Sequence, residues 1–183
     1  QRLIVPALIR PASEADCTRI AEITGEAITT GFAHFGSVPD SPEDVVAHWR
    51  RDREVYPWFV AECTGDHGRG VVGYSRATQW KPRAAYDWTC ESAVYIASAS
   101  HGRGIGRMLY EHLFAELELR GFRCVLGGVT LPNPASERLH EAMGMSIVGT
   151  FPAVGFKMGA WRGVRYYVKV LGDGSPPTRS PSA

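Results

Sequence analysis

The chain has 183 residues, 44% of them hydrophobic, which is enough apolar material for the core of one compact domain. Its 20 Lys and Arg nearly balance 19 Asp and Glu, and no basic run is interleaved with aromatic residues, so nucleic acid is not expected as a partner. No apolar stretch approaches the roughly 20 residues of a membrane helix, and the apolar run near the start is too short for a signal peptide. A soluble, cytoplasmic protein without a membrane partner is expected.

The four cysteines are Cys17, Cys63, Cys90 and Cys124. They are far apart, form no C-x-x-C pair and have no nearby His in metal-ligand spacing, so we expect buried thiols and no metal site. A nucleophilic role for Cys90 stays open because it lies beside the site described below, although no His or Asn partner is identifiable.

The first half of the chain predicts a strand followed by two helices. Residues 7–10 suit a strand. Ser13 with Asp16 three positions later predicts the start of a helix. Pro42 after Ser41, with acidic residues next, predicts the start of a second helix. The segment between these helices is too apolar for a plain solvated loop.

The remainder predicts strands around two further helices, one ending at Gly121 and one running from Asn133 to about Gly144. The order β-α-α-β-β-β-α-β-α-β-β predicts an α/β fold of the α+β mixed-sheet kind, with helices on both faces, in a single domain over residues 7–171. The tail, residues 172–183, is rich in Ser and Pro and is expected to be disordered. Strands are expected at 58–63 and 70–75, joined as a hairpin through a loop at 64–69, and at about 87–96, 123–129, 146–156 and 164–170.

The most informative feature is the strand end Val94-Tyr95-Ile96 followed by His101-Gly102-Arg103-Gly104-Ile105-Gly106-Arg107, which opens a helix. Its three glycines allow positive φ and close backbone approach, and the first N–H groups of the helix attract an anion. The run lacks the Gly-Lys-Ser/Thr of a P-loop and reads G-x-G-x-G, not the dinucleotide fingerprint G-x-G-x-x-G. We therefore expect a phosphate cradle of another kind; a purely structural turn is the alternative.

This run resembles the acyl-CoA turn of the GNAT N-acetyltransferases, Gln/Arg-x-x-Gly-x-Gly/Ala, and departs from it at His101. From about Ile9 to Tyr167 the chain is similar to the phosphinothricin acetyltransferase group, which includes enzymes acting on methionine sulfoximine and methionine sulfone. A departure lies near Thr29, where related sequences tend to carry an acidic residue. The resemblance rests on Tyr56-Pro57-Trp58, the block 80–92, Leu131-Pro132-Asn133, Arg138-Leu139-His140-Glu141 and Val154-Gly155-Phe156-Lys157.

The resemblance implies the GNAT fold, acetyl-CoA as co-substrate, no metal and a homodimer. The segment 151–167 suits either a dimer interface or the lip of a pocket. Asn133 is also a good helix N-cap without any ligand, and the two arginines of the turn could simply be solvated. The implied cofactor-binding residues are Val94, Tyr95, Ile96, Gly102, Arg103, Gly104, Ile105, Gly106, Arg107 and Asn133.

The chemistry requires a general base, because an α-amine is mostly ammonium at pH 7 and only the neutral amine attacks a thioester. Glu91 starts the strand that the resemblance places along the cofactor, so we expect it to be the base, acting through a water. A carboxylate paired with Arg or Lys on a strand surface is the alternative. His140 is a second candidate for proton handling, against the alternative of a satisfied helical histidine.

An amino-acid analogue with a carboxylate and a phosphinate or sulfoximine group needs cationic partners. Lys81, Arg83 and Tyr86 precede the strand of Glu91, and the resemblance favours them for this role over a solvated basic loop. Phe35 and Val164 are candidate apolar walls of the substrate site, or core residues.

We therefore expect an N-acetyltransferase acting on the α-amine of phosphinothricin, methionine sulfoximine or methionine sulfone. A peptide N-terminus and a polyamine are alternatives, although the basic cluster disfavours a polyamine. An acyl-CoA-binding sensor without catalysis is a further alternative.

Overall fold

The computed structural model describes residues 7–65 and 68–177. Within them, seven strands form one sheet in the order β1-β2-β3-β4-β5-β7-β6, in which β4 and β5 are parallel and all other neighbours antiparallel. The elements are β1 (Ala7–Pro11), α1 (Cys17–Thr30), α2 (Pro42–Asp52), β2 (Trp58–Gly65), β3 (Gly68–Gln79), β4 (Thr89–Ile96), α3 (Ile105–Leu119), β5 (Cys124–Thr130), α4 (Pro134–Ala142), β6 (Ser146–Lys157) and β7 (Ala160–Val170).

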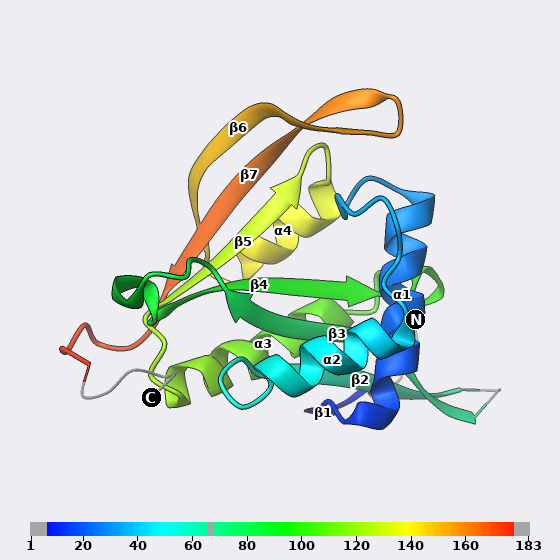
Figure 1. The fold of residues 1–183 in the computed structure, drawn as a ribbon, viewed down its shortest axis with the longest axis horizontal. Coiled ribbons are helices and arrows are strands. Elements are labelled where there is room, and N and C mark those ends of the chain that lie inside the picture. The colour runs from blue at the N-terminus through cyan, green and yellow to red at the C-terminus, as the bar shows by residue number, and fades with distance from the viewer. Residues whose placement is uncertain (1–6, 66–67, 178–183) are drawn as a thin grey trace.

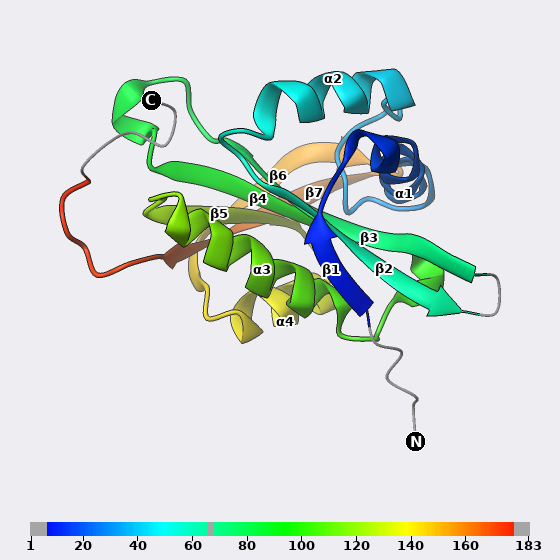
Figure 2. The ribbon, with the colours of Figure 1, turned by 90° about the horizontal axis from the view of Figure 1, so that it is seen from below.

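The helices cover both faces of the sheet, as predicted. Figure 2 shows α1 and α2 on one face and α3 and α4 on the other. On the α3 side Leu109, Leu113 and Leu117 are completely buried, and on the α1 side Ile20 and Ile23 are almost completely buried. Each such side chain contributes roughly 1.5–3 kcal/mol to stability. No helix among the described residues is long and apolar enough to cross a membrane.

The predicted helix starts are confirmed by their capping geometry. The Ser13 hydroxyl donates to Asp16 Oδ2 at 2.8 Å, and the backbone N–H of Ser13 donates to the same atom at 2.7 Å. A 3₁₀ turn at residues 14–16 precedes α1. Ser41 and Asp44 form the same reciprocal pair before α2, with Pro42 in the first turn. Both starts satisfy N–H groups that have no partner inside the helix.

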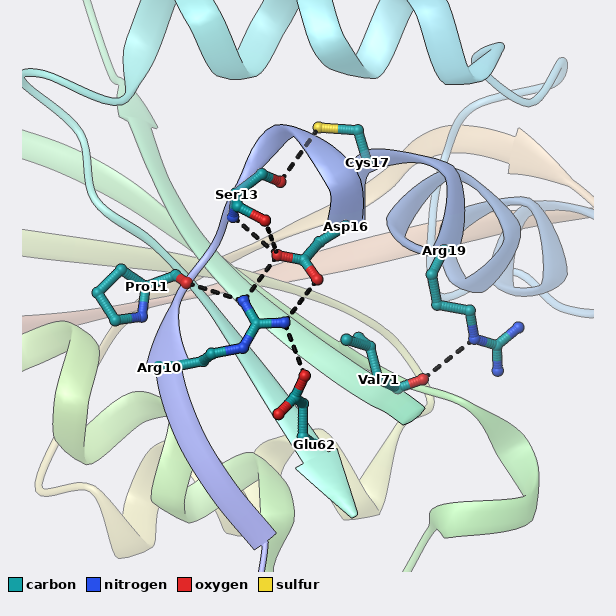
Figure 3. Close-up of polar contacts among 8 residues, drawn as sticks. All are labelled: Arg10, Pro11, Ser13, Asp16, Cys17, Arg19, Glu62 and Val71. Atoms are coloured by element: carbon teal, nitrogen blue, oxygen red, sulfur yellow. Dashed lines mark hydrogen bonds and ion pairs between the residues drawn. The ribbon is translucent and has the colours of Figure 1, made fainter. Parts of the chain in front are cut away.

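Arg10 fastens the first helical segment to the edge of the sheet (Figure 3). Its guanidinium donates to both oxygens of Asp16, at 2.7 and 2.8 Å, and to Glu62 on β2 at 2.8 Å. Burial alone would raise the pKa of Asp16, but the hydrogen bonds from Arg10 and Ser13 outweigh it and hold that pKa below its usual range. The connection from β1 into α1 is therefore held by charge as well as by packing.

The glycine predicted to end α3 does so by a local hydrogen-bond pattern. Gly121 has φ 87°, its N–H donates to the carbonyl of Glu118 at 3.0 Å, and the N–H of Phe122 donates to the carbonyl of Leu117 at 3.0 Å. These two bonds define a Schellman ending, which satisfies carbonyls that the helix leaves free.

The last hairpin differs from the prediction. A strand was expected from residue 164, but β7 begins at Ala160. Met158 and Gly159 have φ of 50° and 72°, so two residues in the left-handed region reverse the chain and let pairing resume at once.

The loop expected at 64–69 is shorter, because β2 reaches residue 65 and β3 starts at residue 68; residues 66 and 67 lie outside the described residues.

The first part of the expected disordered tail lies against the end of α3. The N–H of Gly172 donates to Glu118 at 3.0 Å, and the guanidinium of Arg123 donates to the carbonyl of Leu171. Residues 178–183 lie outside the described residues, as do residues 1–6.

Candidate active site

The sheet opens between its two parallel strands. β4 pairs with β5 over Thr89–Glu91 and Cys124–Leu126, and beyond these residues the strands separate (Figure 1). Where the pairing stops, the Ser92 hydroxyl donates to the carbonyl of Leu126 at 3.0 Å. The edge of β4 after Glu91 thus has no strand partner on this side within the described chain, and its backbone groups can bind a ligand.

A cleft of about 550 Å³ fills this opening. It runs between α1, the end of β4 and the starts of α3 and α4, and its size is typical of small-molecule sites. His140 lines it, while Glu91 and the five predicted substrate residues stand outside its lining. All the predicted cofactor residues line the cleft: Val94, Tyr95, Ile96, Gly102, Arg103, Gly104, Ile105, Gly106, Arg107 and Asn133.

The glycine turn has the conformation expected of an anion cradle at two of its three glycines. Gly102 and Gly104 have φ of 73° and 78°, and Gly104 is the N-cap of α3. The predicted positive φ of Gly106 is wrong, because this residue already belongs to the helix. A Cβ there would lie 3.1 Å from Leu139, so its lack of a side chain lets α3 approach α4.

The polar ends of the cleft are held by local hydrogen bonds. His101 Nε2 lies 2.8 Å from the carbonyl of Ile96, which can only accept, so this nitrogen carries the proton and fastens the turn to the strand. The Asn133 side chain accepts from the N–H of Ser136 at 3.2 Å and caps α4, as predicted. Arg107 pairs with Glu111 at 2.8 Å.

His140 is a buried residue with one assigned tautomer. It is 3% exposed, and Nδ1 donates to the carbonyl of Ser136 at 2.8 Å, which leaves Nε2 as an acceptor facing the Tyr110 hydroxyl at 3.4 Å. Burial lowers the pKa of His140 and raises the pKa of Tyr110 to about 12. The ring can lie here because residue 127 is glycine; a Cβ at Gly127 would be 2.6 Å from Nε2.

The polar contacts continue to the point where the strands part. Ser92 Oγ lies 3.5 Å from the Tyr110 hydroxyl while it donates to Leu126. A buried line of polar groups therefore joins α4, α3 and β4 along the wall of the cleft.

Glu91 meets two β7 residues at a glycine. A Cβ at Gly128 would lie 3.5 Å from each of Glu91 Oε1, Tyr166 Cζ and Val164 Cγ1, and Gly128 itself lines the cleft. Burial, then the negative charge of Glu91 and its hydrogen bond with the hydroxyl, raise the pKa of Tyr166. The carboxylate thus lies close to Gly128, which lines the cleft, and has a tyrosine donor beside it.

Comparison with known proteins decides the family. Residues 17–145 match the profile of the acetyltransferase (GNAT) family. The chain belongs to the GNAT family. It is 38% identical over 172 residues to a phosphinothricin N-acetyltransferase of Streptomyces viridochromogenes, covering 94% of this chain and 92% of that protein. It is 30% identical to an L-methionine sulfoximine/L-methionine sulfone acetyltransferase of Salmonella typhimurium, covering 92% and 97%.

A solved GNAT structure has the same fold. The crystal structure of a phosphinothricin acetyltransferase (Pat) from Sinorhizobium meliloti in complex with acetyl-CoA superposes with a TM-score of 0.87 at 31% identity, covering 94% of each chain. The predicted family, fold and enzyme class, an N-acetyltransferase, are confirmed, and acetyl-CoA is the co-substrate of this type of enzyme.

The predicted basic cluster of this GNAT chain lies in the connection between β3 and β4. Lys81 and Arg83 are exposed, and Lys81 Nζ lies 5.4 Å from the centre of the Trp80 ring. Trp80 and Tyr86 form an edge-to-face pair with ring centres 5.0 Å apart. The cluster precedes the strand of Glu91 directly, and its role toward a substrate remains a prediction.

The apolar link between α1 and α2 packs on the β6–β7 hairpin of this GNAT chain. The Phe35 ring rests on Gly155, where any Cβ would overlap it. Lys157 Nζ donates to the carbonyls of His34 at 2.7 Å and Gly36 at 2.5 Å. Phe35 therefore stands at the hairpin, and a role as substrate wall is a prediction.

Two alternatives weighed from the sequence lose support. Among the described residues no Arg or Lys forms an ion pair with Glu91, which argues against a surface ion pair there. Cys90 is fully buried and burial raises its pKa, so the thiolate a nucleophile needs is disfavoured.

All four cysteines are free, and Cys124 is half-buried, not buried as expected. In the described part of the chain, no group of three or more His, Cys, Asp or Glu could hold a metal ion.

Sequence reasoning missed five residues of this site: Ser92, Tyr110, Gly127, Gly128 and Tyr166. The paired glycines inside a buried strand were a usable signal, because glycine in a strand interior often marks close approach of another group. Tyr110 belongs to the buried side of α3, and nothing in the local pattern separates it from core residues.

Proposed function

We propose that this chain transfers the acetyl group of acetyl-CoA to the α-amine of a small amino-acid analogue such as phosphinothricin, methionine sulfoximine or methionine sulfone. The observation that carries the proposal is the position of Gly128. This residue lines the cleft, and a Cβ built on it would lie 3.5 Å from Glu91 Oε1. Cofactor cleft and candidate base therefore meet at one point of the sheet. The names of the relatives supply the substrate class.

The described residues fit acetyl-CoA in two ways. The positive φ of Gly102 and Gly104 turns the chain so that the first N–H groups of α3 are available to the pyrophosphate. The free edge of β4 at Val94 and Ile96 offers main-chain hydrogen bonds to the pantetheine arm. Asn133 lines the same cleft. When bound, acetyl-CoA supplies an activated acetyl thioester.

In the proposed reaction Glu91 takes the proton of the substrate ammonium, directly or through a water. The neutral amine then forms the N–C bond as the C–S bond of the thioester breaks; the nitrogen loses its second proton as the amide forms, and the CoA thiolate takes up a proton in exchange, so that free CoA thiol is released. Tyr166 donates to Glu91 and orients it. His140 is the second residue proposed for proton handling: it is held neutral, and its Nε2 can accept a hydrogen bond from the Tyr110 hydroxyl, which it orients in the wall of the cleft.

The substrate is proposed to lie on the Glu91 side of the opening. Val164 supports this placement because it shares the contact at Gly128 with Glu91. Lys81, Arg83 and Tyr86 are proposed to bind the anionic or oxygen-rich end, and Phe35 to form an apolar wall. A polyamine would prefer an acidic surface to this basic one.

The test is the release of free CoA thiol with phosphinothricin, methionine sulfoximine, methionine sulfone, spermidine and a short peptide. We expect turnover with at least one of the first three. Glu91→Gln should lower kcat by about 10²–10⁴-fold with little change in the KM of acetyl-CoA. The matched control is Glu22→Gln, because Glu22 is an exposed carboxylate paired with Arg19 on α1.

Two results would contradict the proposal. Turnover of spermidine or the peptide alone would move the substrate to another amine class. A wild-type protein that binds acetyl-CoA but acetylates none of the five compounds would favour the non-catalytic sensor.

We further propose that the enzyme has a detoxifying role in the cytoplasm. We also propose that it is a homodimer that forms through the β6–β7 hairpin. Soluble monomers rarely expose large contiguous apolar patches. The exposed large apolar side chains of this hairpin are Ile147, Val148, Phe151, Val154, Phe156, Met158, Trp161 and Val170.

A further inference from the structure

Arg76 shares a face of the sheet with Glu91. In the antiparallel pair of β3 and β4, Arg76 lies opposite Ala93 and Thr78 lies opposite Glu91. Residues that lie directly opposite each other, or two apart on one strand, project from the same face of a sheet. Arg76 and Glu91 are therefore diagonal neighbours, for which the typical separation of the two residues' backbones is about 7–8 Å. Ala93 lines the cleft. A guanidinium is therefore placed one step along the sheet from the candidate base.

The Arg76 side chain is held by packing and not by an acidic partner. Its Cζ lies 4.9 Å from the centre of the Trp58 ring, and the side chain is half-buried. Nε is enclosed and has no hydrogen-bond partner, and across residues 7–65 and 68–177 no carboxylate pairs with this guanidinium. A half-buried guanidinium without a direct ion-pair partner is costly, and an incoming anion would offset that cost.

The charge of Arg76 acts toward the cleft. Burial lowers the pKa of His34, and the positive charges of Arg76 and Lys157 lower it further. Arg76 also opposes the rise in pKa that burial causes at Tyr95, which lines the cleft. Asp40 is the acidic group that acts on His34, but its carboxylate is 3.8 Å from His48 and half-exposed. The groups near Arg76 are thus the aromatic rings of Trp58, His34 and Tyr95, the candidate base Glu91, which also acts on Tyr95, and the second positive charge of Lys157.

We propose that Arg76 binds the α-carboxylate of the amino-acid substrate. This inference rests on the proposed function and deepens it. In an α-amino acid, the amine and the carboxylate are attached to one carbon, so a group that binds the carboxylate must stand close to the base that deprotonates the amine. The diagonal position of Arg76 beside Glu91 meets this requirement, and it leaves the basic cluster at residues 81–86 for the distal phosphinate or sulfone.

The assignment makes Arg76 a specificity residue. A guanidinium holds a carboxylate through charge-assisted hydrogen bonds, which are stronger than those to a neutral carbonyl. Peptide N-termini and simple amines lack the α-carboxylate. Arg76 therefore favours free amino acids over both.

The experiment compares methionine sulfone with its α-carboxamide, a neutral analogue of nearly the same shape. Wild type should prefer the acid. Arg76→Met, which keeps an unbranched apolar stem against Trp58, should lose about 10–100-fold in kcat/KM for the acid, mostly through KM. The amide should change less than about 3-fold, and the KM of acetyl-CoA should stay constant. Arg19→Met on α1 is the control arginine, because Arg19 is exposed, pairs with Glu22 and is not one of the residues that line the cleft.

The outcomes separate recognition from a structural role. Equal losses for acid and amide, with a lowered melting temperature, would overturn the assignment and make Arg76 a packing partner of Trp58. If Arg76→Met does not fold, Arg76→Lys carries the same comparison, because it keeps the charge and should retain part of the preference for the acid.

Direct binding distinguishes this inference from the proposed function. If wild type acetylates neither compound, the proposed function is wrong for this substrate class, and calorimetric titration of the CoA-bound protein with methionine sulfone decides on Arg76. Binding that is lost in Arg76→Met supports the carboxylate site. No binding to wild type, or equal binding to both proteins, overturns it.

Discussion

At His140 a single hydrogen bond decides what the side chain can do. Donation from Nδ1 to the Ser136 carbonyl directs the lone pair of Nε2 at Tyr110, and burial disfavours a charged ring. A neutral imidazole can accept from the tyrosine but has no second proton to donate. The hydroxyl of Tyr110, whose pKa is raised to about 12, therefore keeps its proton at neutral pH.

The lowered pKa of His140 should appear in the pH dependence of stability. Because the unfolded ring titrates near its usual pKa of about 6.5 and the buried ring below it, the neutral ring stabilises the fold above pH 6.5. That contribution is lost as the pH falls toward the lowered value, by at most about 1.4 kcal/mol per pH unit. Urea unfolding at pH 7.5 and 5.5 should show a smaller loss in His140→Asn than in wild type. His112→Asn, on an exposed position of α3, should keep the wild-type loss; identical losses in all three proteins would contradict the prediction.

At the scale of an element, α3 has glycine at both ends for one conformational reason. Gly104 and Gly121 have φ of 78° and 87°, and a Cβ at either would meet nothing within 4 Å. Substitution is thus costly through the backbone alone. The two positions differ in function, because Gly104 lines the cleft and Gly121 lies at the opposite end of the helix.

We expect Gly104→Ala and Gly121→Ala to lose similar stability, about 1–2 kcal/mol each, because alanine is strained in the left-handed region. Gly104→Ala should also raise the KM of acetyl-CoA by about 10-fold, since the loss of one well-placed N–H donor to a charged group has this size. Thermal melting and initial-rate kinetics on both variants check this. A KM that rises equally in Gly121→Ala would show that loss of helix stability, and not the cradle, is responsible.

At the scale of the whole molecule, β6 is the outermost strand beside β7, and the hairpin carries most of the exposed large apolar side chains. Phe156 and Trp161 form an edge-to-face pair near its tip, and Trp161 is 67% exposed. The same hairpin holds the link between α1 and α2 through Lys157. A dimer formed through this hairpin would therefore also hold the segment that carries Phe35, which is proposed to line the substrate site.

Trp161→Asp should convert a wild-type dimer into a monomer in sedimentation velocity while leaving the far-ultraviolet circular dichroism unchanged, because the side chain contributes little to the core of one chain. Leu119→Asp is the control, since Leu119 is 82% exposed on α3, away from the hairpin. A wild-type protein that sediments as a monomer at micromolar concentration would refute the dimer.

Local physics accounts for what could be predicted. Ser13 with Asp16, Ser41 with Asp44, and Gly121 act within four or five residues, so the helix boundaries follow from spacing. The cofactor-binding residues that the resemblance implies lie mainly in one strand end and the turn after it, so they are close together in sequence, and all of them line the cleft. The start of β7 was missed because the turn before it is Met158-Gly159. The pairs that most often indicate a two-residue hairpin turn are Asn-Gly, Asp-Gly and Gly-Gly.

Tertiary structure alone decided the rest. Glu91, Gly128 and Tyr166 come from β4, β5 and β7, and their convergence depends on strand order and register, which no local pattern specifies. The separation of β4 from β5, and the position of Arg76 diagonal to Glu91, depend on the same pairing. The sequence determined the elements and the glycine turn because their interactions are short-range; the positions of the candidate base Glu91 and of Arg76 relative to the cleft were decided by long-range strand pairing.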